Sequence, residues 1–183
     1  MKHIRLPLTE ADIAALQAGD EVLLSGPLYT ARDAAHQRLC RCLQEGKPLP
    51  VELAGETIYY VGPSPAKPGE VIGSAGPTTS GRMDAMSPRL LDLGNKIMIG
   101  KGKRDDTVKA AVVRNGAVYL AALGGAGALM AKSVQTLEVI AWPDLGCEAV
   151  RRLIVKDMPL TVILDAHGGD LYQSGPAAYL EAK

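Results

Sequence analysis

The sequence predicts an α/β fold, formed as a single layered domain over residues 1–183. Short apolar segments typical of strands alternate along the chain with helix-like segments, and this alternation favours helices layered against a sheet. A chain of 183 residues with 47% hydrophobic composition can bury one sizeable core, so one compact unit is expected. The 20 glycines and 12 prolines indicate many tight turns between short elements.

Strands are expected where short apolar runs lie between turn signals. They comprise residues 2–8, 21–25, 57–61, 71–72, 96–99, 117–123, 134–141 and 160–164. The strand 21–25 is expected to end at the Gly-Pro pair that follows it. The proline-rich connection 62–69 predicts a rigid surface crossing.

Helices are expected where a polar cap precedes a helix-like segment and glycine or proline follows it. Thr9 caps the first helix, which ends near Gly19; Thr30, or the turn beside it, caps the second, which Gly46 and Pro48 terminate. The expected helices comprise residues 10–18, 31–44, 83–93, 105–115, 127–131 and 146–155.

The bulk charge excludes some function classes. Lys plus Arg and Asp plus Glu each total 20, so the net charge is zero, whereas nucleic-acid binding needs a marked basic excess. Phe is absent and aromatics make up 4%, which disfavours base-stacking platforms. No apolar run is long enough to span a bilayer and no apolar signal region opens the chain, so we expect a cytoplasmic protein without membrane contact.

The three cysteines, Cys40, Cys42 and Cys147, fit a reducing compartment because they form no disulfide-like framework. Residues 40 and 42 lie two apart on an expected helix, so their side chains face different directions and are poorly placed to share a metal. We expect ordinary buried or half-buried thiols, and no metal site on this chain.

The stretch from Gly73 to Arg104 carries the strongest functional signal. Thr78, Thr79 and Arg82 lie in a glycine-punctuated loop before the expected helix 83–93, whose N-terminal N–H groups would point at them. A second, basic loop contains Lys101, Lys103 and Arg104. Together these features predict a site for a small anion, a carboxylate or a phosphate; the alternative is that the first loop only caps a helix. The spacing matches neither a P-loop nor a dinucleotide fingerprint.

Arg32 is expected in the first turn of a helix, where a cation opposes the helix dipole. An anion bound there would explain the arginine, although Asp33 beside it could equally neutralise the charge. His36, one turn later, is expected to be a surface or packing residue. Asp165, His167 and Asp170 suggest a metal or acid–base site, but they surround a Gly-Gly pair and a polar turn is the favoured interpretation.

Four motifs, in order, resemble the β domain of class I iron–sulfur fumarases and the related L-tartrate dehydratases. They are GPLYTARDAAH (residues 26–36), GPTTSGRMD (76–84), GKGKR (100–104) and YLAALGGA (119–126). The similarity covers residues 8–172, and four motifs in order are far more specific than any one alone. The resemblance implies a swivelling β/β/α fold for the domain.

The resemblance also implies an activity and a set of residue roles. Members of this family reversibly add water across a double bond flanked by two carboxylates, as in the conversion of fumarate to L-malate, with a [4Fe–4S] cluster ligated by cysteines of an α part. Carried over by motif, Thr78 and Arg82 match catalytic residues, Thr78 as the proposed base. Arg32 and Lys101 match substrate-binding cations, and Thr79 is grouped with them. Lys103 and Arg104 are left to face the partner, the substrate or solvent.

The leading expectation is therefore the β subunit of a heteromeric hydro-lyase, active only with an α subunit and acting on a C4 dicarboxylate. Fumarate hydratase is favoured; an L-tartrate dehydratase β subunit and a non-catalytic anion-binding or regulatory module are the alternatives. An exposed apolar face meant for the α subunit would favour a homodimer when the chain is isolated.

Overall fold

Seven strands form one mixed sheet in residues 1–181, the part of the chain that the computed structural model describes; the strand order is β1-β2-β3-β4-β5-β7-β6. The strands are β1 (Lys2–Arg5), β2 (Glu21–Thr30), β3 (Thr57–Tyr59), β4 (Ile97–Gly100), β5 (Val118–Ala121), β6 (Val134–Ala141) and β7 (Val150–Leu164). The helices are α1 (Glu10–Ala14), α2 (Asp33–Gln44), α3 (Ser87–Asp92), α4 (Asp106–Arg114), α5 (Gly127–Lys132) and α6 (Leu171–Glu181), with two 3-10 helices, η1 (Ser80–Met83) and η2 (Pro143–Glu148). The predicted α/β class is confirmed.

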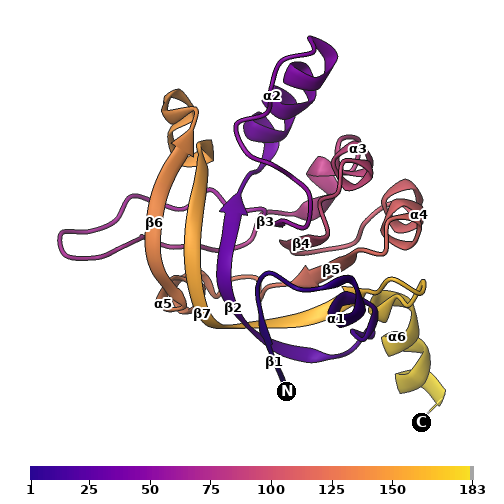
Figure 1. Cartoon of the computed structure of the whole chain (residues 1–183). Helices are drawn as coiled ribbons and strands as arrows, with labels where there is room; N and C mark the ends of the chain where they lie inside the picture. Colours follow the sequence, from indigo (N-terminus) through magenta and orange to yellow (C-terminus); the bar gives the residue numbers. More distant parts are fainter. Residues whose placement is uncertain (182–183) are drawn as a thin grey trace.

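The sheet has a parallel and an antiparallel part. Strands β1 to β5 pair in parallel with their neighbours, whereas β7 runs antiparallel to β2, β5 and β6. Because β7 pairs with both β2 and β5, the strands β2, β3, β4, β5 and β7 close into a ring. Figure 1 shows β2, β7 and β6 as long strands beside the shorter β3, β4 and β5.

Side chains on the two faces of the parallel strands enter two separate cores. Tyr59 and Ile97 belong to the core between the parallel and antiparallel strands. Their neighbours Ile58 and Met98 belong to a second core with residues of α2, α3 and α4. This alternation follows from the two-residue period of a strand. The result is three layers: antiparallel strands, parallel strands and helices (Figure 1).

Several expected elements are present close to their expected bounds. Thr9 caps α1 in a capping box, because its side chain accepts from Asp12 N and the Asp12 carboxylate accepts from Thr9 N. Asp105 caps α4 by accepting a hydrogen bond from Val108 N over 2.8 Å. Strand β6 has the expected bounds, while β1 and α1 are shorter than expected.

The expected helix 146–155 is wrong: β7 begins at Val150 and continues for 15 residues. Val150, Leu153 and Ile154 mimic a helical period, but β7 pairs with β2 along most of its length, and this tertiary pairing overrides the local signal. The expected strand 160–164 is the end of this same strand. Helix α6 was not anticipated, and residues 71–72 do not form a strand.

Strand β2 also continues past its expected end. Gly26 adopts a φ of 123°, and the pairing register with β7 shifts there, so the chain bends and continues to Thr30 instead of stopping at the Gly-Pro pair. The expected cap at Thr30 is wrong, because its buried hydroxyl accepts from Arg151 N of β7 over 3.1 Å. The N-cap position of α2 is Arg32, and Ala34 N donates instead to Glu148 over 2.6 Å.

Residues 63–74 form an arm that projects at the left of Figure 1. Its two limbs are joined at the base, where Ser64 N donates to the carbonyl of Ser74 over 3.0 Å and Ser74 N donates to Ser64 Oγ over 2.7 Å. The connection lies at the surface, as expected, but it projects from the body as an arm that leaves the end of β3 and returns to residues 75–79 (Figure 1).

A buried ion pair joins the two motif loops. Arg104 is 4% exposed, and its Nε donates to Asp84 Oδ1 over 2.6 Å while its Nη2 donates to Ser87 Oγ over 2.8 Å. The guanidinium also lies 5.4 Å and 5.1 Å from the ring centres of Tyr60 and Tyr119. Arg104 was expected to face the partner, the substrate or solvent. It faces none of them, because it lies in the core under the helices.

We predict strong coupling between Asp84 and Arg104. Asp84→Ala or Arg104→Met should each lower the free energy of unfolding by about 3–5 kcal/mol, because each leaves a charge buried without its partner. The double variant should lose less than the sum of the two, by about 1–3 kcal/mol, as expected for contacting residues. Urea denaturation of the four proteins measures this coupling, and strictly additive losses would contradict the pair.

We also predict that Gly100 at the end of β4 tolerates no side chain. A Cβ there would overlap Ser80 Oγ and lie 3.1 Å from Tyr60 Cδ2, so Gly100→Ala should cost about 1–3 kcal/mol of unfolding free energy. Gly175→Ala in α6 is the matched control, because its nearest neighbour would be Leu171 Cδ1 at 3.7 Å and alanine favours helix. Equal stability of the two variants in thermal unfolding would refute this steric account.

Candidate functional site

The five predicted site residues lie on segments that follow the carboxyl ends of three adjacent parallel strands. Arg32 follows β2, and Lys101 follows β4 directly. Thr78, Thr79 and Arg82 follow β3 by way of the arm. Neighbouring parallel strands end at the same edge of a sheet, and this edge is where α/β folds place ligands. The topology therefore gathers residues that are up to 69 positions apart in the sequence.

Arg32 and Arg82 are joined through one carboxylate. Arg32 Nε donates to Asp33 Oδ2 over 3.0 Å, and Arg82 Nε donates to Asp33 Oδ1 over 2.7 Å. Partial burial opposes ionisation of Asp33, but hydrogen bonds from its own N–H and from Arg32, together with the charge of Arg82, lower the pKa of Asp33 below its usual value. The carboxylate therefore stays ionised between the two guanidinium groups at neutral pH.

Lys101 is held beside the threonines by backbone pairing. Thr79 and Lys101 form a parallel β-bridge, Ser80 N donates to the carbonyl of Lys101 over 2.8 Å, and Lys101 N donates to Ser80 Oγ over 3.0 Å. Tyr119 on β5 fixes the serine by donating its hydroxyl to Ser80 Oγ over 2.9 Å. The Lys101 side chain passes close to Gly124, where a Cβ would lie 3.5 Å from Lys101 Cδ.

Thr78 connects the arginine pair to the Lys101 loop. The N–H of Thr78 donates to the carbonyl of Tyr60 over 2.7 Å. Gly62, two residues after Tyr60, lies against Arg32, because a Cβ at Gly62 would be 3.0 Å from Arg32 Cδ. Thr78 is 8% exposed, and its hydroxyl makes no hydrogen bond within residues 1–181. Within the described residues, His36 Nε2 is the one fully buried side-chain N or O atom without a partner. The unpartnered Thr78 oxygen therefore keeps some contact with solvent.

The expected helix 83–93 is present only as α3, so the expected helix N-terminus at the anion site is wrong. The chain forms the 3-10 turn η1 at Ser80–Met83, and α3 begins only at Ser87. Asp84 is held by Arg104 and accepts from Asp105 N over 2.7 Å, which turns the chain away from a continuous helix. The positive charge beside Thr78 and Thr79 therefore comes from side chains and not from the start of α3.

Sequence reasoning missed the residues that support the site from behind. Glu148 lies 3.5 Å from Arg32 Nε and accepts from Ala34 N, although it is 114 residues away from that alanine. Ser80 and Tyr119 lie inside the quoted motifs, yet nothing in their residue types indicates that they bond each other. A covarying pair of positions is the signal that could have identified such contacts.

His36 is a packing residue, as expected. It is fully buried, its Nδ1 lies 3.1 Å from the carbonyl of Arg32, and its ring meets that of Tyr60 edge-on at 5.2 Å. Burial lowers the pKa of His36 to about 4, so the ring is neutral at pH 7. Its place behind Arg32 makes it part of the wall of the site.

The other candidate metal and redox residues lie elsewhere. Asp165 accepts from Ala18 N, His167 N and Gly169 N, which confirms the turn that was favoured for this segment. Cys40 and Cys42 are half-buried, but Cys147 is exposed, so the expectation of burial was wrong for that residue. Within residues 1–181, no three His, Cys, Asp or Glu side chains converge as metal ligands.

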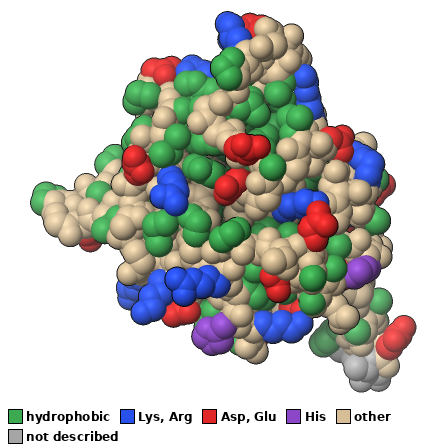
Figure 2. All heavy atoms as spheres, viewed as in Figure 1, with side chains coloured by type: hydrophobic (Ala, Val, Ile, Leu, Met, Phe, Trp, Pro, Cys, Tyr) green, Lys and Arg blue, Asp and Glu red, His purple; other side chains and the backbone are tan. Residues whose placement is uncertain are grey.

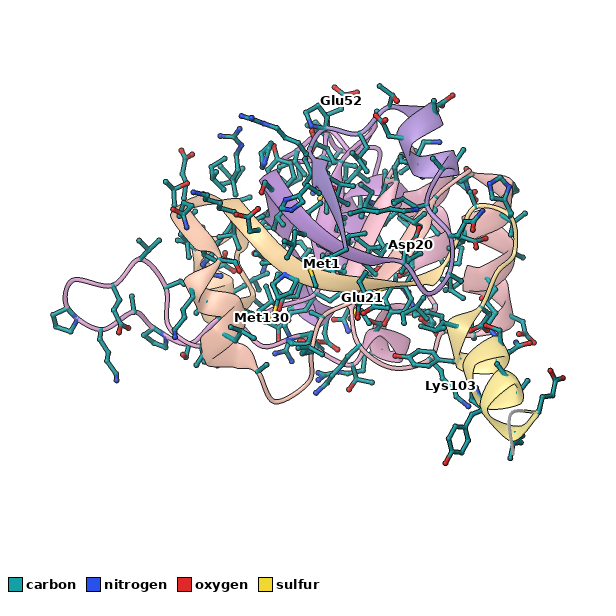
Figure 3. The ribbon with its side chains drawn as sticks, turned by 90° about the horizontal axis from the view of Figure 1, so that it is seen from below. Met1, Asp20, Glu21, Glu52, Lys103 and Met130 are labelled. Carbon is teal, nitrogen blue, oxygen red and sulfur yellow. The ribbon has the colours of Figure 1, made fainter. Side chains whose placement is uncertain are left out.

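The surface around the fold is mixed. Figure 2 shows hydrophobic, acidic and basic side chains interspersed on the face over β2, β7 and β6. Lys103 is exposed and lies beside α6 (Figure 3). Large exposed hydrophobic side chains come from several segments and include Val71, Leu93, Leu123, Leu129 and Val139. None of the helices in residues 1–181 is long and apolar enough to cross a membrane.

Comparison with known proteins gives concordant matches. The chain is 39% identical over 160 residues to fumarate hydratase 2 of Leishmania major, a match that covers 84% of this chain and 28% of that protein. It is 36% identical over 175 residues to the anaerobic class I fumarate hydratase of Escherichia coli, covering 94% and 31%. The chain thus spans less than a third of the length of these two fumarate hydratases.

A third relative is matched over nearly its full length. It is named "Putative L(+)-tartrate dehydratase subunit beta" in Methanocaldococcus jannaschii, with 39% identity over 179 residues, 94% of this chain and 92% of that protein. The family model described as fumarase C-terminus matches residues 1–175. This chain therefore belongs to the fumarase C-terminus family, together with class I fumarate hydratases and the tartrate dehydratase β subunit.

Proposed function

We propose that this chain is the β subunit of a two-part hydro-lyase that reversibly hydrates fumarate to L-malate. The observation that carries the proposal is the gathering of Arg32, Arg82 and Lys101 with an open Thr78 hydroxyl at one edge of the sheet. A C4 dicarboxylate brings two negative charges, and such a cation set complements them. The names of the relatives support the same reaction class.

The arginines bind and orient the substrate in this proposal. Asp33 occupies only the Nε of each guanidinium, so the terminal nitrogens of both remain available to clamp a carboxylate through two parallel hydrogen bonds. Lys101, paired through its backbone with Thr79, supplies a third positive charge. Holding both ends of the substrate in this way fixes the carbon–carbon bond relative to the Thr78 hydroxyl.

Thr78 is proposed to accept the proton that leaves the carbon next to a carboxylate when malate is dehydrated. A threonine hydroxyl is a weak base, and it can act only if nearby cations stabilise its deprotonated form. Arg82, four residues later, and Lys101, paired with the adjacent Thr79, are the candidates for that stabilisation. In the hydration direction the same oxygen returns the proton to carbon.

We propose that a [4Fe–4S] cluster belongs to the α part and is not ligated here. The described residues do not fit the cluster, because Cys40 and Cys42 are half-buried on α2, Cys147 is exposed on η2, and no three ligand side chains converge. When bound by the partner, such a cluster would supply a Lewis acid for the substrate hydroxyl. The full-length match to a protein named as a β subunit supports a separate partner chain.

We propose that residues 1–183 form one domain of the swivelling β/β/α type. The support is the order of the layers: antiparallel strands, parallel strands and then helices, with a hydrophobic core on each side of the parallel layer.

The second candidate function is L-tartrate dehydration by the same β subunit. The near-complete mutual coverage with the tartrate dehydratase relative favours it, since the fumarate hydratases are about three times longer than this chain. A non-catalytic anion-binding module is the third candidate. The presence of Arg32, Thr78, Arg82 and Lys101 together disfavours it, because a retired enzyme would be expected to lose some of them.

Anaerobic assay of the chain with its α subunit tests the function. The mixture should hydrate fumarate while the isolated chain does not, and the ratio of kcat/KM for malate and L-tartrate decides between the two substrates. Full activity of the isolated chain would contradict the two-part proposal.

Substitutions in the same assay test the residue roles. Thr78→Ala should lower kcat by about 10²–10⁴-fold through loss of the base, and Thr78→Ser should retain more activity. Arg82→Lys should lower kcat/KM about 10²-fold, because a lysine cannot clamp a carboxylate with two parallel bonds. Lys103→Ala, in the same basic loop but beside α6, is the control and should change kcat/KM by less than about twofold. Wild-type rates in Thr78→Ala would remove the proposed base.

A further inference from the structure

Asp33 stands at the centre of the arginine pair, and its two carboxylate oxygens are used separately. Oδ2 accepts from Arg32 Nε over 3.0 Å and Oδ1 accepts from Arg82 Nε over 2.7 Å. One guanidinium comes from Arg32 at the N-cap of α2 and the other from Arg82 on η1, 49 residues after Asp33. A single side chain thus joins two elements that are remote in the sequence.

We propose that Asp33 is a positioning residue, which holds Arg32 and Arg82 with their terminal nitrogens directed at the two-carboxylate substrate before that substrate binds. This inference rests on the proposed function and adds a residue to its machinery. A guanidinium carries five N–H donors in a fixed fork. Because Asp33 takes the Nε–H of each, four donors per arginine remain, including the end that binds a carboxylate through two bonds.

Asp33 offsets the repulsion between the two guanidinium groups and restricts the rotamers of Arg82. Two guanidinium groups that converge on one ligand repel each other, and an ionised carboxylate between them offsets that repulsion. The Arg82 side chain is 51% exposed, so without a fixed partner it would sample many rotamers and lose that freedom only on binding.

Asp33 is itself well held. It is the first residue of α2, its side chain is 22% exposed, and the next residue, Ala34, donates its N–H to Glu148 over 2.6 Å. Glu148 Oε1 also lies 3.5 Å from Arg32 Nε. A position at the start of a packed helix is more rigid than one in a loop, which suits a residue that orients others.

Asp33 could instead only neutralise the charge of the two arginines, and this alternative predicts the opposite effect on substrate binding. If Asp33 only neutralises charge, it competes with an anionic substrate, and removing its charge should tighten binding. If it positions the arginines, removing the charge should weaken binding. Asp33→Asn separates the two, because asparagine has the same shape but only one accepting oxygen, so it cannot accept from both Nε–H groups.

The first measurement uses the isolated chain and needs no activity. Hydrogen exchange of the arginine Nε–H groups, followed by NMR, should be slow for Arg32 and Arg82 in the wild type and at least about tenfold faster for one or both in Asp33→Asn. Arg104 Nε, which donates to Asp84, is the internal reference and should stay protected in both proteins. Unchanged exchange at both Arg32 and Arg82 would overturn the inference.

The second measurement uses the complex with the α subunit. Asp33→Asn should raise the KM for the dicarboxylate about tenfold and lower kcat/KM about 10²-fold, since both arginines lose their orientation. The matched control is Asp144→Asn, which removes the charge of Asp144 and one of its two bonds, of 3.0 and 2.8 Å, from Arg38 on the same helix, and which should leave both constants within about twofold. A lower KM in Asp33→Asn would show that Asp33 competes with substrate and would overturn the positioning role. If the wild-type complex has no hydro-lyase activity, the proposed function fails, while the exchange measurement still decides whether Asp33 holds the arginines.

Discussion

The buried pair of Arg104 and Asp84 is the interaction on which the site depends. It connects the segment that carries Thr78 and Arg82 to the loop that carries Lys101, and neither segment belongs to a long regular element. Removing two charges from water costs several kcal/mol per ion, so such a pair is weak evidence for stability as such. Its full hydrogen bonding, with Ser87 Oγ, Met98 Sδ and Asp105 N–H as further partners, is what holds the two loops in one register.

Arg82 in the motif 76–84 and Arg104 in the motif 100–104 differ in their environment, because Arg104 is buried and Arg82 is half exposed. The Arg104 side chain is fully buried, and each of its three guanidinium nitrogens donates to a protein atom. Arg104 is therefore inaccessible to a ligand. Arg82 is half exposed and shares a single carboxylate with Arg32, so most of its donors stay free. Two residues of the same type, 22 positions apart, thus differ: Arg104 anchors the two loops, and Arg82 keeps free donors for the ligand that we propose. Residue type alone cannot distinguish these roles, because burial is set by the fold around them.

Local signals were sufficient for the parts of the fold that local forces determine. The Thr9 cap, the helix over residues 105–115 and the strand β6 were predicted because caps and periodic patterns act within a few residues. The expected helix 146–155 and the expected start of the helix 83–93 failed for a common reason: tertiary partners outweighed their helix-like pattern. Pairing with β2 draws residues 150–164 into a strand, and the Asp84–Arg104 pair interrupts the first helix after one 3-10 turn. The candidate site residues were inferred from motifs, whereas Asp33 was considered only as a local neutraliser and Glu148 was not considered, since the contacts of both cross from one element to another.

The composition of the site bears on which substrate the complete enzyme accepts. Under the proposed function, three cations and two threonines recognise carboxylates, and carboxylates are what fumarate, malate and tartrate have in common; these molecules differ in their hydroxyl groups. Strong discrimination of a hydroxyl requires a buried polar group that is left unpaired when the wrong substrate binds. The cations here lie on loops at the rim of the sheet, and Arg82 is half exposed. Under the proposed function, this chain supplies affinity and orientation for any C4 dicarboxylate. The choice among them then falls to the groups that close over the hydroxyl-bearing carbons, and those groups belong to the partner.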